Sequence, residues 1–292
     1  MQDKKVFVVG AGTMGSGIVQ VCAQAGYQVT MRDINDEILG RALNTIKWSV
    51  GKLVEKGRVE GTVDDILSRI RTTTDMQDGK EADIVIEAVN ENLELKRDLF
   101  RQLDEICPPH AILGTNTSSI SITSIARATK RPDKVVGIHF WNPAPLMRLV
   151  EIIKGLLTSE ETMKVAAEFS HSLGKETIRV NKDVPGFAIN RFNVAASVEA
   201  MRLVEEGVAT VEDIDKGARL GLGRPMGPFE TGDLNGLDVG LNILQGLYDE
   251  TGDPKFFPPT ILRQKVNAGQ WGRKTGVGWY RYDDKGNKIG PA

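Results

Sequence analysis

Val6-Phe7-Val8-Val9-Gly10-Ala11-Gly12-Thr13-Met14-Gly15 is an apolar strand followed at once by a Gly-x-Gly-x-x-Gly turn, and a helical pattern continues to Ala25. In this order the first glycine permits the tight turn and the second lets the backbone approach a pyrophosphate. The third allows the helix to pack closely on the strand. Unpaired N–H groups at the helix start suit phosphate oxygens. The segment therefore predicts a dinucleotide-binding turn, formed by Gly10, Ala11, Gly12, Thr13, Met14 and Gly15.

A carboxylate ends the next predicted strand, which runs from Gln28 to Asp33. Asp33 lies 18 residues after Gly15, near the spacing at which an acid bonds both ribose hydroxyls of NAD. Its charge would repel an adenosine 2′-phosphate, so NAD is the expected cofactor. Two alternatives stay open: Arg32 could accept a 2′-phosphate and favour NADP, and Asp33 could be only the N-cap of the helix predicted from Asp36.

Strand and helix patterns alternate from Lys5 to about Lys182, which is typical of a parallel sheet with crossover helices. The predicted strands are 6–10, 28–33, 70–73, 84–89, 111–115, 135–140, 149–154 and 177–180, and the predicted helices are 13–25, 36–56, 93–106 and 160–173. Later helices are predicted at 187–204, 211–221 and 236–248. The fold class is therefore α/β: a Rossmann-like NAD-binding domain of residues 1–183, then an all-α C-terminal substrate and dimerisation domain of residues 184–292.

Composition excludes several classes of protein. Thirty-seven basic and 39 acidic residues give a net charge of −2, which does not support binding to nucleic acid or a membrane surface. No apolar run approaches the roughly 20 residues of a membrane helix, and Met1-Gln2-Asp3 leave no room for a signal peptide. Cys22 and Cys107 lack paired spacing, which argues against a zinc site. A cytoplasmic protein without a metal is expected.

His139 is the candidate acid/base, and the chain has only two other histidines, His110 and His171. The strand that carries it and the next strand flank a turn containing Asn142-Pro143-Ala144-Pro145. If these strands form an antiparallel hairpin, Glu151 lies directly opposite His139. A carboxylate on one imidazole nitrogen leaves the other to exchange a proton, as hydride transfer from a carbinol requires. A packing role is the alternative for His139, and the other two histidines are expected at the surface without such a partner.

Six further motifs follow the glycine turn, in the order Glu87-Ala88-Val89-Asn90-Glu91-Asn92-Leu93, Asn116-Thr117-Ser118-Ser119, His139-Phe140-Trp141-Asn142-Pro143, Pro185-Gly186-Phe187, Asn190-Arg191 and Gly227-Pro228-Phe229-Glu230. Over essentially the whole chain, this order resembles the short-chain L-3-hydroxyacyl-CoA dehydrogenase family. Within the family it is most similar to the stand-alone bacterial 3-hydroxybutyryl-CoA dehydrogenases. The resemblance implies an NAD-dependent enzyme that interconverts (S)-3-hydroxybutyryl-CoA and acetoacetyl-CoA in butyrate or fatty-acid metabolism.

The resemblance also implies roles for single residues. It makes His139 the general acid/base, oriented by Glu151, and it makes Ser118 and Asn190 ligands of the substrate's 3-oxygen. Because these residues lie on both domains, catalysis would require the domains to close on each other. Without the resemblance, Ser118 could equally be the N-cap of a helix near 121–126, and Asn190 would be an ordinary helix residue. The cofactor contacts implied beyond the glycine turn and Asp33 are Glu91, Lys96, Ser118, Asn142 and Lys274.

One edge of the helix predicted at 36–56 could hold the phosphates of coenzyme A. Ser49, Lys52 and Lys56 follow this edge. The resemblance implies coenzyme A contacts at Ser49 and Lys56, and Lys52 is a hypothesis from spacing alone. A solvated basic face is the alternative meaning of such spacing. The buried stripe of the same helix is predicted to be Leu39, Ala42, Ile46, Val50 and Leu53.

Two rival functions share parts of this pattern. A dehydrogenase of a free hydroxy acid, or of a sugar acid such as gulonate, would use the same His139 and Glu151 but would lack the coenzyme A contacts. A non-enzymatic relative, as among lens crystallins, would keep the fold without Ser118, His139, Glu151 and Asn190. The sequence retains all of these residues, so an acyl-CoA substrate is expected.

The C-terminal domain has a physical reason to self-associate. Its helices after Phe187 are rich in apolar residues and offer more hydrophobic surface than about 100 residues readily bury alone. The resemblance implies dimers formed through this domain. A homodimer or higher homo-oligomer is therefore expected.

Overall fold

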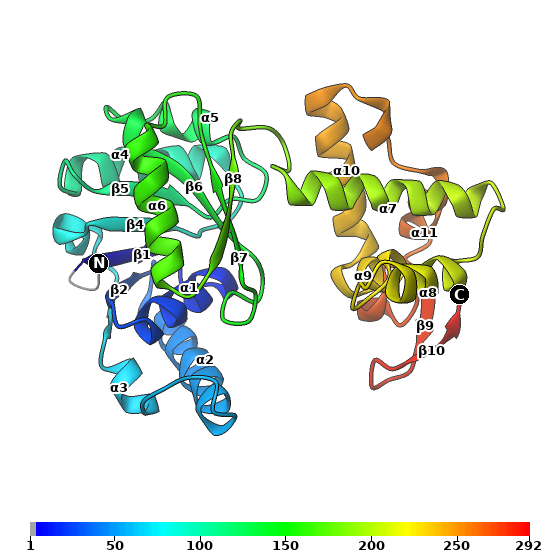
Figure 1. The fold of residues 1–292 in the computed structure, drawn as a ribbon, viewed down its shortest axis with the longest axis horizontal. Coiled ribbons are helices and arrows are strands. Elements are labelled where there is room, and N and C mark those ends of the chain that lie inside the picture. The colour runs from blue at the N-terminus through cyan, green and yellow to red at the C-terminus, as the bar shows by residue number, and fades with distance from the viewer. Residues whose placement is uncertain (1–3) are drawn as a thin grey trace. The chain divides into compact units, whose positions relative to one another are not determined.

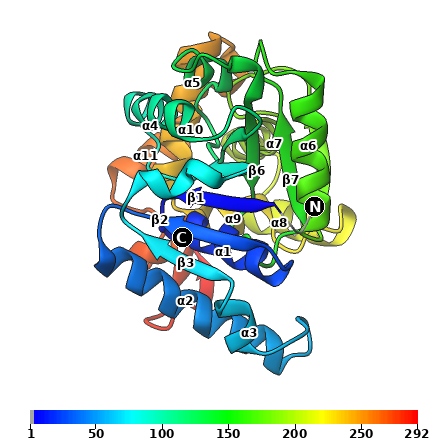
Figure 2. The same cartoon turned by 90° about the vertical axis from the view of Figure 1, so that its left-hand side faces the viewer.

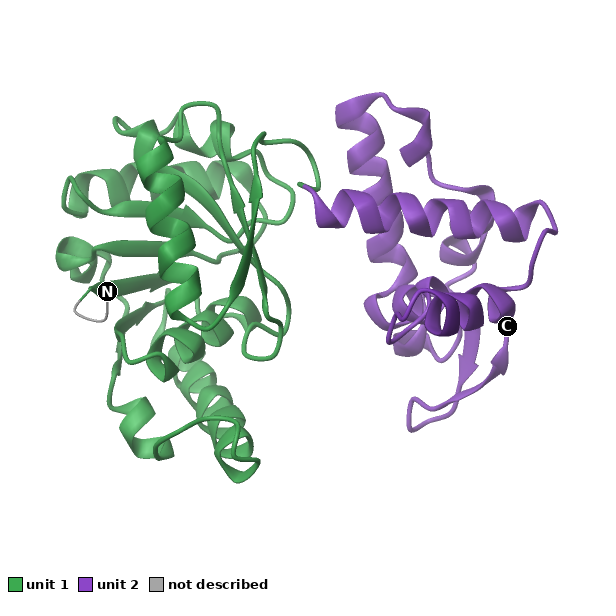
Figure 3. Cartoon of the chain, in the orientation of Figure 1, with its two compact units in different colours: residues 1–187 green, residues 188–292 purple. Residues whose placement is uncertain are grey.

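The computed structural model describes residues 4–292 and divides the chain after Phe187 into two units, 1–187 and 188–292 (Figure 3). The expectation that no signal peptide precedes the fold rests partly on Met1, Gln2 and Asp3, which lie outside the described residues. The sequence placed the domain change slightly earlier, after residue 183. Across residues 4–292, no helix is both long and apolar enough to cross a membrane.

One eight-stranded sheet forms the centre of the first unit, with its strands in the order β3-β2-β1-β4-β5-β6-β7-β8 (Figure 1). The strands are β1 Lys5–Val9, β2 Gln28–Arg32, β3 Ile70–Thr73, β4 Ile84–Glu87, β5 Ile112–Thr115, β6 Val135–Phe140, β7 Leu149–Ile153 and β8 Glu176–Val180. Neighbouring strands run parallel except β6 and β7, so β7 and β8 oppose the other six. All eight were predicted within two residues of their bounds. In β1, β4, β5, β6 and β7 the signal is a nearly continuous apolar run, which marks strands buried on both faces.

Helices cover both faces of this sheet (Figure 2). Alternate residues of β1 point to opposite faces: Val6 and Val8 pack with buried residues of α1, α2 and α6, whereas Phe7 and Val9 pack with those of α4 and α5. The short α3 was not predicted. The helices are α1 Thr13–Gln24, α2 Asp36–Glu55, α3 Val63–Leu67, α4 Leu93–Ile106, α5 Ile122–Ala126 and α6 Glu160–Ser172, with the 3-10 helices η1 Met76–Glu81 and η2 Pro132–Lys134.

The order of the strands determines where a ligand can bind. From β1 the chain moves to one side to form β2 and β3, and it returns on the other side of β1 as β4. The carboxyl ends of β1 and β4 therefore border a topological switch point, where open α/β sheets bind ligands. The glycine turn follows β1 at this place, and the segment after β4 lies against it, with the N–H of Ala88 bonded to the carbonyl of Val9 at 2.8 Å.

The second unit is helical, as predicted, but the sequence interpretation was incomplete. It missed α9, α11 and a two-stranded antiparallel sheet formed by β9 and β10. The Gly/Pro-rich segment Gly223-Arg224-Pro225-Met226-Gly227-Pro228 ends where α9 begins, at Pro228. The elements are α7 Ile189–Glu205, α8 Val211–Gly221, α9 Pro228–Asn235, α10 Leu237–Thr251, α11 Thr260–Asn267, β9 Tyr280–Tyr282 and β10 Lys288–Pro291, with the 3-10 helices η3 Pro254–Phe256 and η4 Arg273–Thr275.

Two buried carboxylates bind this hairpin to the helices. Asp233 on α9 accepts hydrogen bonds from the N–H groups of Trp279 (2.8 Å) and Tyr280 (2.9 Å), and from the hydroxyl of Tyr282 (2.9 Å). Asp215 on α8 accepts a bond from the Tyr280 hydroxyl at 2.8 Å. Burial raises the pKa of both carboxyls. These partners are 46 to 65 residues apart in the sequence, so no local pattern could reveal the hairpin.

Candidate active site

The glycine turn has the geometry that a dinucleotide requires. Gly10 has φ +105°, and a Cβ there would collide with the backbone oxygen of Ala88. A Cβ on Gly15 would overlap the carbonyl oxygen of Gly10 and push α1 away from the strand. Among residues 4–292, a Cβ on Gly12 would meet nothing within 4 Å, and no side chain caps the N–H groups of the helix that begins at Thr13. The turn therefore offers backbone donors on an open side, which fits a pyrophosphate.

Asp33 lies against this turn and does not cap a helix. Its Oδ2 accepts a hydrogen bond from the N–H of Ala11 at 2.6 Å, and its Oδ1 accepts one from Ile34 at 2.7 Å. The N-cap of α2 is Asn35, whose side chain accepts from the N–H of Ile38 at 2.9 Å, so the capping alternative for Asp33 is wrong. A carboxylate has about four acceptor sites, so two remain for ribose hydroxyls.

His139 and Glu151 lie next to each other, as predicted from the antiparallel pairing of their strands. β6 and β7 pair antiparallel, with His139 directly opposite Glu151, and Nδ1 lies 2.8 Å from Oε2. The Glu151 side chain is fully buried, and that of His139 is 8% exposed. An ionised carboxylate only accepts, so Nδ1 donates and Nε2 is left to exchange a proton. The rings of Trp141 and Phe187 lie 5.4 and 5.8 Å from the imidazole and shield it from water.

The other two histidines differ from His139 in burial. The expectation that His110 has no carboxylate partner is wrong, because its Nε2 lies 2.9 Å from Oδ1 of Asp83. The His110 side chain is 65% exposed, however. His171 is also exposed, and its Nε2 lies 2.9 Å from the hydroxyl oxygen of Thr177. A buried hydrogen bond to a carboxylate, made within the sheet, therefore distinguishes His139.

Glu91 and Ser118 lie together beyond the carboxyl ends of β4 and β5. The N–H of Ser118 donates to Oε1 of Glu91 at 2.8 Å, and the hydroxyl of Thr117 donates to Oε2 at 2.8 Å. The N-cap of α5 is Ser121, which accepts from the N–H of Ser124 at 3.1 Å. The capping alternative for Ser118 is therefore wrong.

Lys96 is buried within this polar network. Its side chain is 1% exposed, and Nζ lies 2.6 Å from Oε1 of Glu87 and 3.6 Å from Oε2 of Glu91. Glu87 also accepts from the hydroxyl of Thr115 at 2.7 Å. Direct contact of Lys96 with a cofactor stays a prediction. In this structure the ammonium group of Lys96 helps to hold the Glu91 carboxylate in place. Sequence reasoning missed Glu87, although an acid closing an apolar strand was a visible signal.

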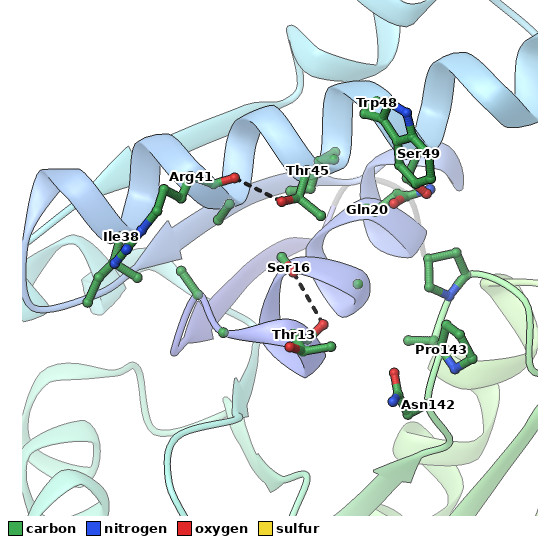
Figure 4. A pocket seen from close by; sticks show the side chains of 17 residues that line it. Thr13, Ser16, Gln20, Ile38, Arg41, Thr45, Trp48, Ser49, Asn142 and Pro143 are labelled. Atoms are coloured by element: carbon green, nitrogen blue, oxygen red, sulfur yellow. Dashed lines mark hydrogen bonds between the residues drawn. The ribbon is translucent and has the colours of Figure 1, made fainter. Parts of the chain in front are cut away.

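A cavity of about 370 Å³ lies between α1, α2 and the 142–145 turn (Figure 4). Five predicted ligand residues line it: Ser49, Asn142, and Ala11, Gly12 and Thr13 of the glycine turn. The buried stripe of α2 is confirmed residue by residue. Lys52 and Lys56 lie on the exposed side of the helix, and Lys52 forms an ion pair with Glu55 at 2.9 Å. Their contact with coenzyme A stays a prediction.

A buried lysine holds the turn that forms one wall of this cavity. The ammonium group of Lys175 donates to the carbonyls of Ala144 at 2.6 Å and Met147 at 2.8 Å. Burial lowers the pKa of Lys175. Gly17 of α1 packs against the same turn, since a Cβ there would lie 3.2 Å from that of Ala144. Sequence reasoning missed Lys175, because its partners are brought to it by tertiary packing.

Asn190 and Lys274 belong to the second unit and are described within it. Asn190 lies near the start of α7 and lines an apolar cavity of about 370 Å³, together with Met201, Phe229 and Trp279. The ammonium group of Lys274 lies 2.6 Å from Oδ1 of Asp238. The roles implied for Asn190 and Lys274 stay predictions.

The two cysteines pack as apolar residues. Cys22 and Cys107 are both free and buried. Burial raises the pKa of the Cys107 thiol to about 11 and that of Cys22 further. A raised pKa disfavours the thiolate, so burial makes both thiols poor nucleophiles.

Family models match successive parts of the chain. The model described as 3-hydroxyacyl-CoA dehydrogenase, NAD binding domain, matches residues 5–184. The model described as 3-hydroxyacyl-CoA dehydrogenase, C-terminal domain, matches residues 186–282.

Individual relatives match over nearly their full length. A probable 3-hydroxybutyryl-CoA dehydrogenase of Bacillus subtilis is 45% identical over 286 residues, which cover 98% of this chain and 99% of the relative. A 3-hydroxybutyryl-CoA dehydrogenase of Clostridioides difficile is 45% identical over 280 residues, covering 96% and 99%. The crystal structure of an (S)-3-hydroxybutyryl-CoA dehydrogenase from Ralstonia eutropha has a TM-score of 0.92 at 43% identity, and the match covers 96% of this chain and 99% of that one.

Proposed function

The chain belongs to the 3-hydroxyacyl-CoA dehydrogenase family, and from this membership we propose that it interconverts (S)-3-hydroxybutyryl-CoA and acetoacetyl-CoA. It is an oxidoreductase that acts on a CH–OH group and uses NAD. The observation that carries the proposal is the buried His139–Glu151 pair near the carboxyl end of β6, in the same sheet as the glycine turn.

In the proposed mechanism His139 moves the proton. The glycine turn and Asp33 would hold NAD, which would supply the hydride acceptor or donor for carbon 3 of the hydroxyacyl group. In oxidation, Nε2 of His139 removes the proton of the 3-hydroxyl, and in reduction it donates that proton to the 3-oxygen. Glu151 holds the ring through Nδ1 and stabilises its charged form. Ser118 hydrogen-bonds the 3-oxygen, and Glu91 fixes the backbone of Ser118.

The substrate class is tested with NAD⁺ and a matched set of alcohols. We expect turnover of (S)-3-hydroxybutyryl-CoA and none of the (R) isomer above background. Free 3-hydroxybutyrate and L-gulonate should have kcat/KM values lower by about 100-fold or more, because they lack the binding energy of coenzyme A. Oxidation of gulonate as efficiently as of the thioester would contradict the proposal and support the sugar-acid alternative.

Asp33 is expected to set the preference for NAD. The variant Asp33→Asn keeps an acceptor for the Ala11 N–H but removes the charge. It should raise KM for NADH by about 10-fold, because hydrogen bonds to charged groups are the stronger ones, and it should narrow the discrimination against NADPH. Arg32 already donates through Nε to the carbonyl of Thr74 at 3.3 Å. The matched control is Asp36→Asn, an exposed acid on α2.

Steady-state kinetics with each cofactor check this prediction. An unchanged KM for NADH in Asp33→Asn would remove Asp33 from the cofactor site. A wild-type protein that prefers NADPH would instead shift the cofactor assignment to Arg32.

We propose that the protein is a homodimer or higher homo-oligomer through its second unit. This unit exposes several large apolar side chains, Val208 65%, Phe192 65%, Leu220 78% and Leu222 73%, and burying them against a second copy would be favourable. Light scattering after size exclusion should give about 64 kDa or more, twice the 31.9 kDa of the chain. A single species near the mass of one chain at micromolar concentration would contradict the proposal.

We also propose that the protein is located in the cytoplasm. This location is supported by the two free, buried thiols, which suit a reducing compartment.

A further inference from the structure

Gln20 on α1 carries a buried hydrogen-bond donor without a partner. The residue is 2% exposed, and among the described residues nothing accepts a hydrogen bond from its amide nitrogen Nε2. This nitrogen has two N–H donors, and leaving a buried donor unsatisfied destabilises the folded protein. Such a group in a folded protein calls for an explanation, and a bound ligand is one.

The position of Gln20 identifies where that ligand would lie. Gln20 lines the cavity between α1, α2 and the 142–145 turn, and Figure 4 shows it beside Ser49 and Trp48 of α2. The Trp48 side chain is 68% exposed and lines the same cavity. Gln20 and Trp48 therefore offer a neutral donor and a flat apolar surface at one end of the cavity.

The charge of the cavity limits the chemistry of its occupant. Among the described residues that line it, Arg41 is the only charged one, and Ile38, Ile46 and Pro145 contribute apolar surface. A phosphate would need several cations or backbone donors at this end. A neutral chain that carries carbonyl oxygens matches both the amide donor and the apolar walls.

We propose that Nε2 of Gln20 donates a hydrogen bond to an amide carbonyl in the pantetheine arm of the coenzyme A thioester, and that Trp48 packs against the same arm. The inference rests on the proposed function, which supplies the thioester. Pantetheine is an uncharged chain with two amides, so it presents both the acceptor and the apolar atoms. The carboxamide of the nicotinamide ring has similar chemistry, and the experiment must separate the two.

The test compares two glutamines on one helix. Gln20→Met removes the donor while keeping the length of the side chain, and Gln24→Met is the matched control. Gln24 lies one turn further along α1, and its Nε2 also has no partner among the described residues, but it does not line the cavity. We expect Gln20→Met to raise KM for acetoacetyl-CoA by about 3- to 10-fold, the worth of one neutral hydrogen bond. KM for NADH and kcat should change less than about 2-fold, and Gln24→Met should change none of the three.

Three outcomes would overturn the inference. KM for acetoacetyl-CoA could stay unchanged in Gln20→Met, KM for NADH could rise in its place, or Gln24→Met could raise KM for the thioester equally. If Gln20→Met does not fold, Trp48→Ala replaces it, since that exposed side chain can be truncated without a core defect. It should raise KM for the thioester and not for NADH, and an unchanged KM would again overturn the inference.

Binding measurements separate this inference from the proposed function. Calorimetric titration with free coenzyme A needs no turnover, so it is run on the wild type and on both glutamine variants. Weaker binding only in Gln20→Met supports the inference, and equal binding in all three overturns it. A wild-type protein that fails to reduce acetoacetyl-CoA refutes the proposed function, whatever the titrations show.

Discussion

Replacement of His139 with Ala is expected to lower kcat for acetoacetyl-CoA reduction by about 10³-fold, within the range attributed to general acid–base catalysis. The physical reason is the loss of the imidazole that exchanges a proton through Nε2 and that the buried Glu151 carboxylate orients through Nδ1. KM for NADH should change little, because His139 does not line the cavity at the glycine turn. The measurement is the initial rate of NADH oxidation at saturating substrate.

His110→Ala is the matched control for this variant. His110 also lies 2.9 Å from a carboxylate, that of Asp83, but it is exposed. It should keep wild-type kcat. Glu151→Gln should lose less activity than His139→Ala, because an amide oxygen still accepts from Nδ1 but carries no charge. A loss in His139→Ala smaller than about 10-fold, or an equal loss in His110→Ala, would contradict the assignment of the acid/base.

Replacement of Lys96 with Met is expected to lower the free energy of unfolding by about 3–5 kcal/mol, because it leaves Glu87 as an unpaired charge in the interior. The two side chains are 1% and 0% exposed, and their charged atoms lie 2.6 Å apart. For a unit of this size the loss corresponds to a fall in Tm of roughly 10 °C. Thermal melting followed by circular dichroism or calorimetry measures it.

Lys164→Met is the control for the stability of the buried pair. Lys164 lies 3.8 Å from Glu168, and both side chains are exposed, so its loss should cost about 0.5 kcal/mol or less. The double variant Lys96→Met with Glu87→Leu should recover part of the stability, because removing both charges leaves neither unpaired. A change below about 1 kcal/mol in Lys96→Met would show that water or rearrangement satisfies Glu87.

The first unit could be predicted from sequence because its signals are local. Apolar runs, the glycine turn and the hairpin around the 142–145 turn each lie within a few residues, and the antiparallel register gave the pairing of His139 with Glu151. Resemblance was needed to select Ser118 and Asn190. The two capping alternatives could not be resolved from the sequence, and the structure has Asn35 and Ser121 as the caps.

The features that the sequence did not reveal depend on distant packing. Lys175 reaches carbonyls 28 and 31 residues away, and nothing in its neighbours marks it as buried. A polar residue on a helix is common, so the sequence did not single out Gln20. Only its position in the wall of the cavity indicates that it could contact a ligand. The hairpin of the second unit depends on Asp233, which binds backbone 46 residues later in the chain.

The most direct test of the central claim is reduction of acetoacetyl-CoA by the wild-type protein with NADH, followed by loss of NADH absorbance and by chiral analysis of the product. We expect NADH consumption matched mole for mole by (S)-3-hydroxybutyryl-CoA, with NADPH a much poorer donor. A folded protein that binds NADH but oxidises none of it above background with acetoacetyl-CoA would contradict the account.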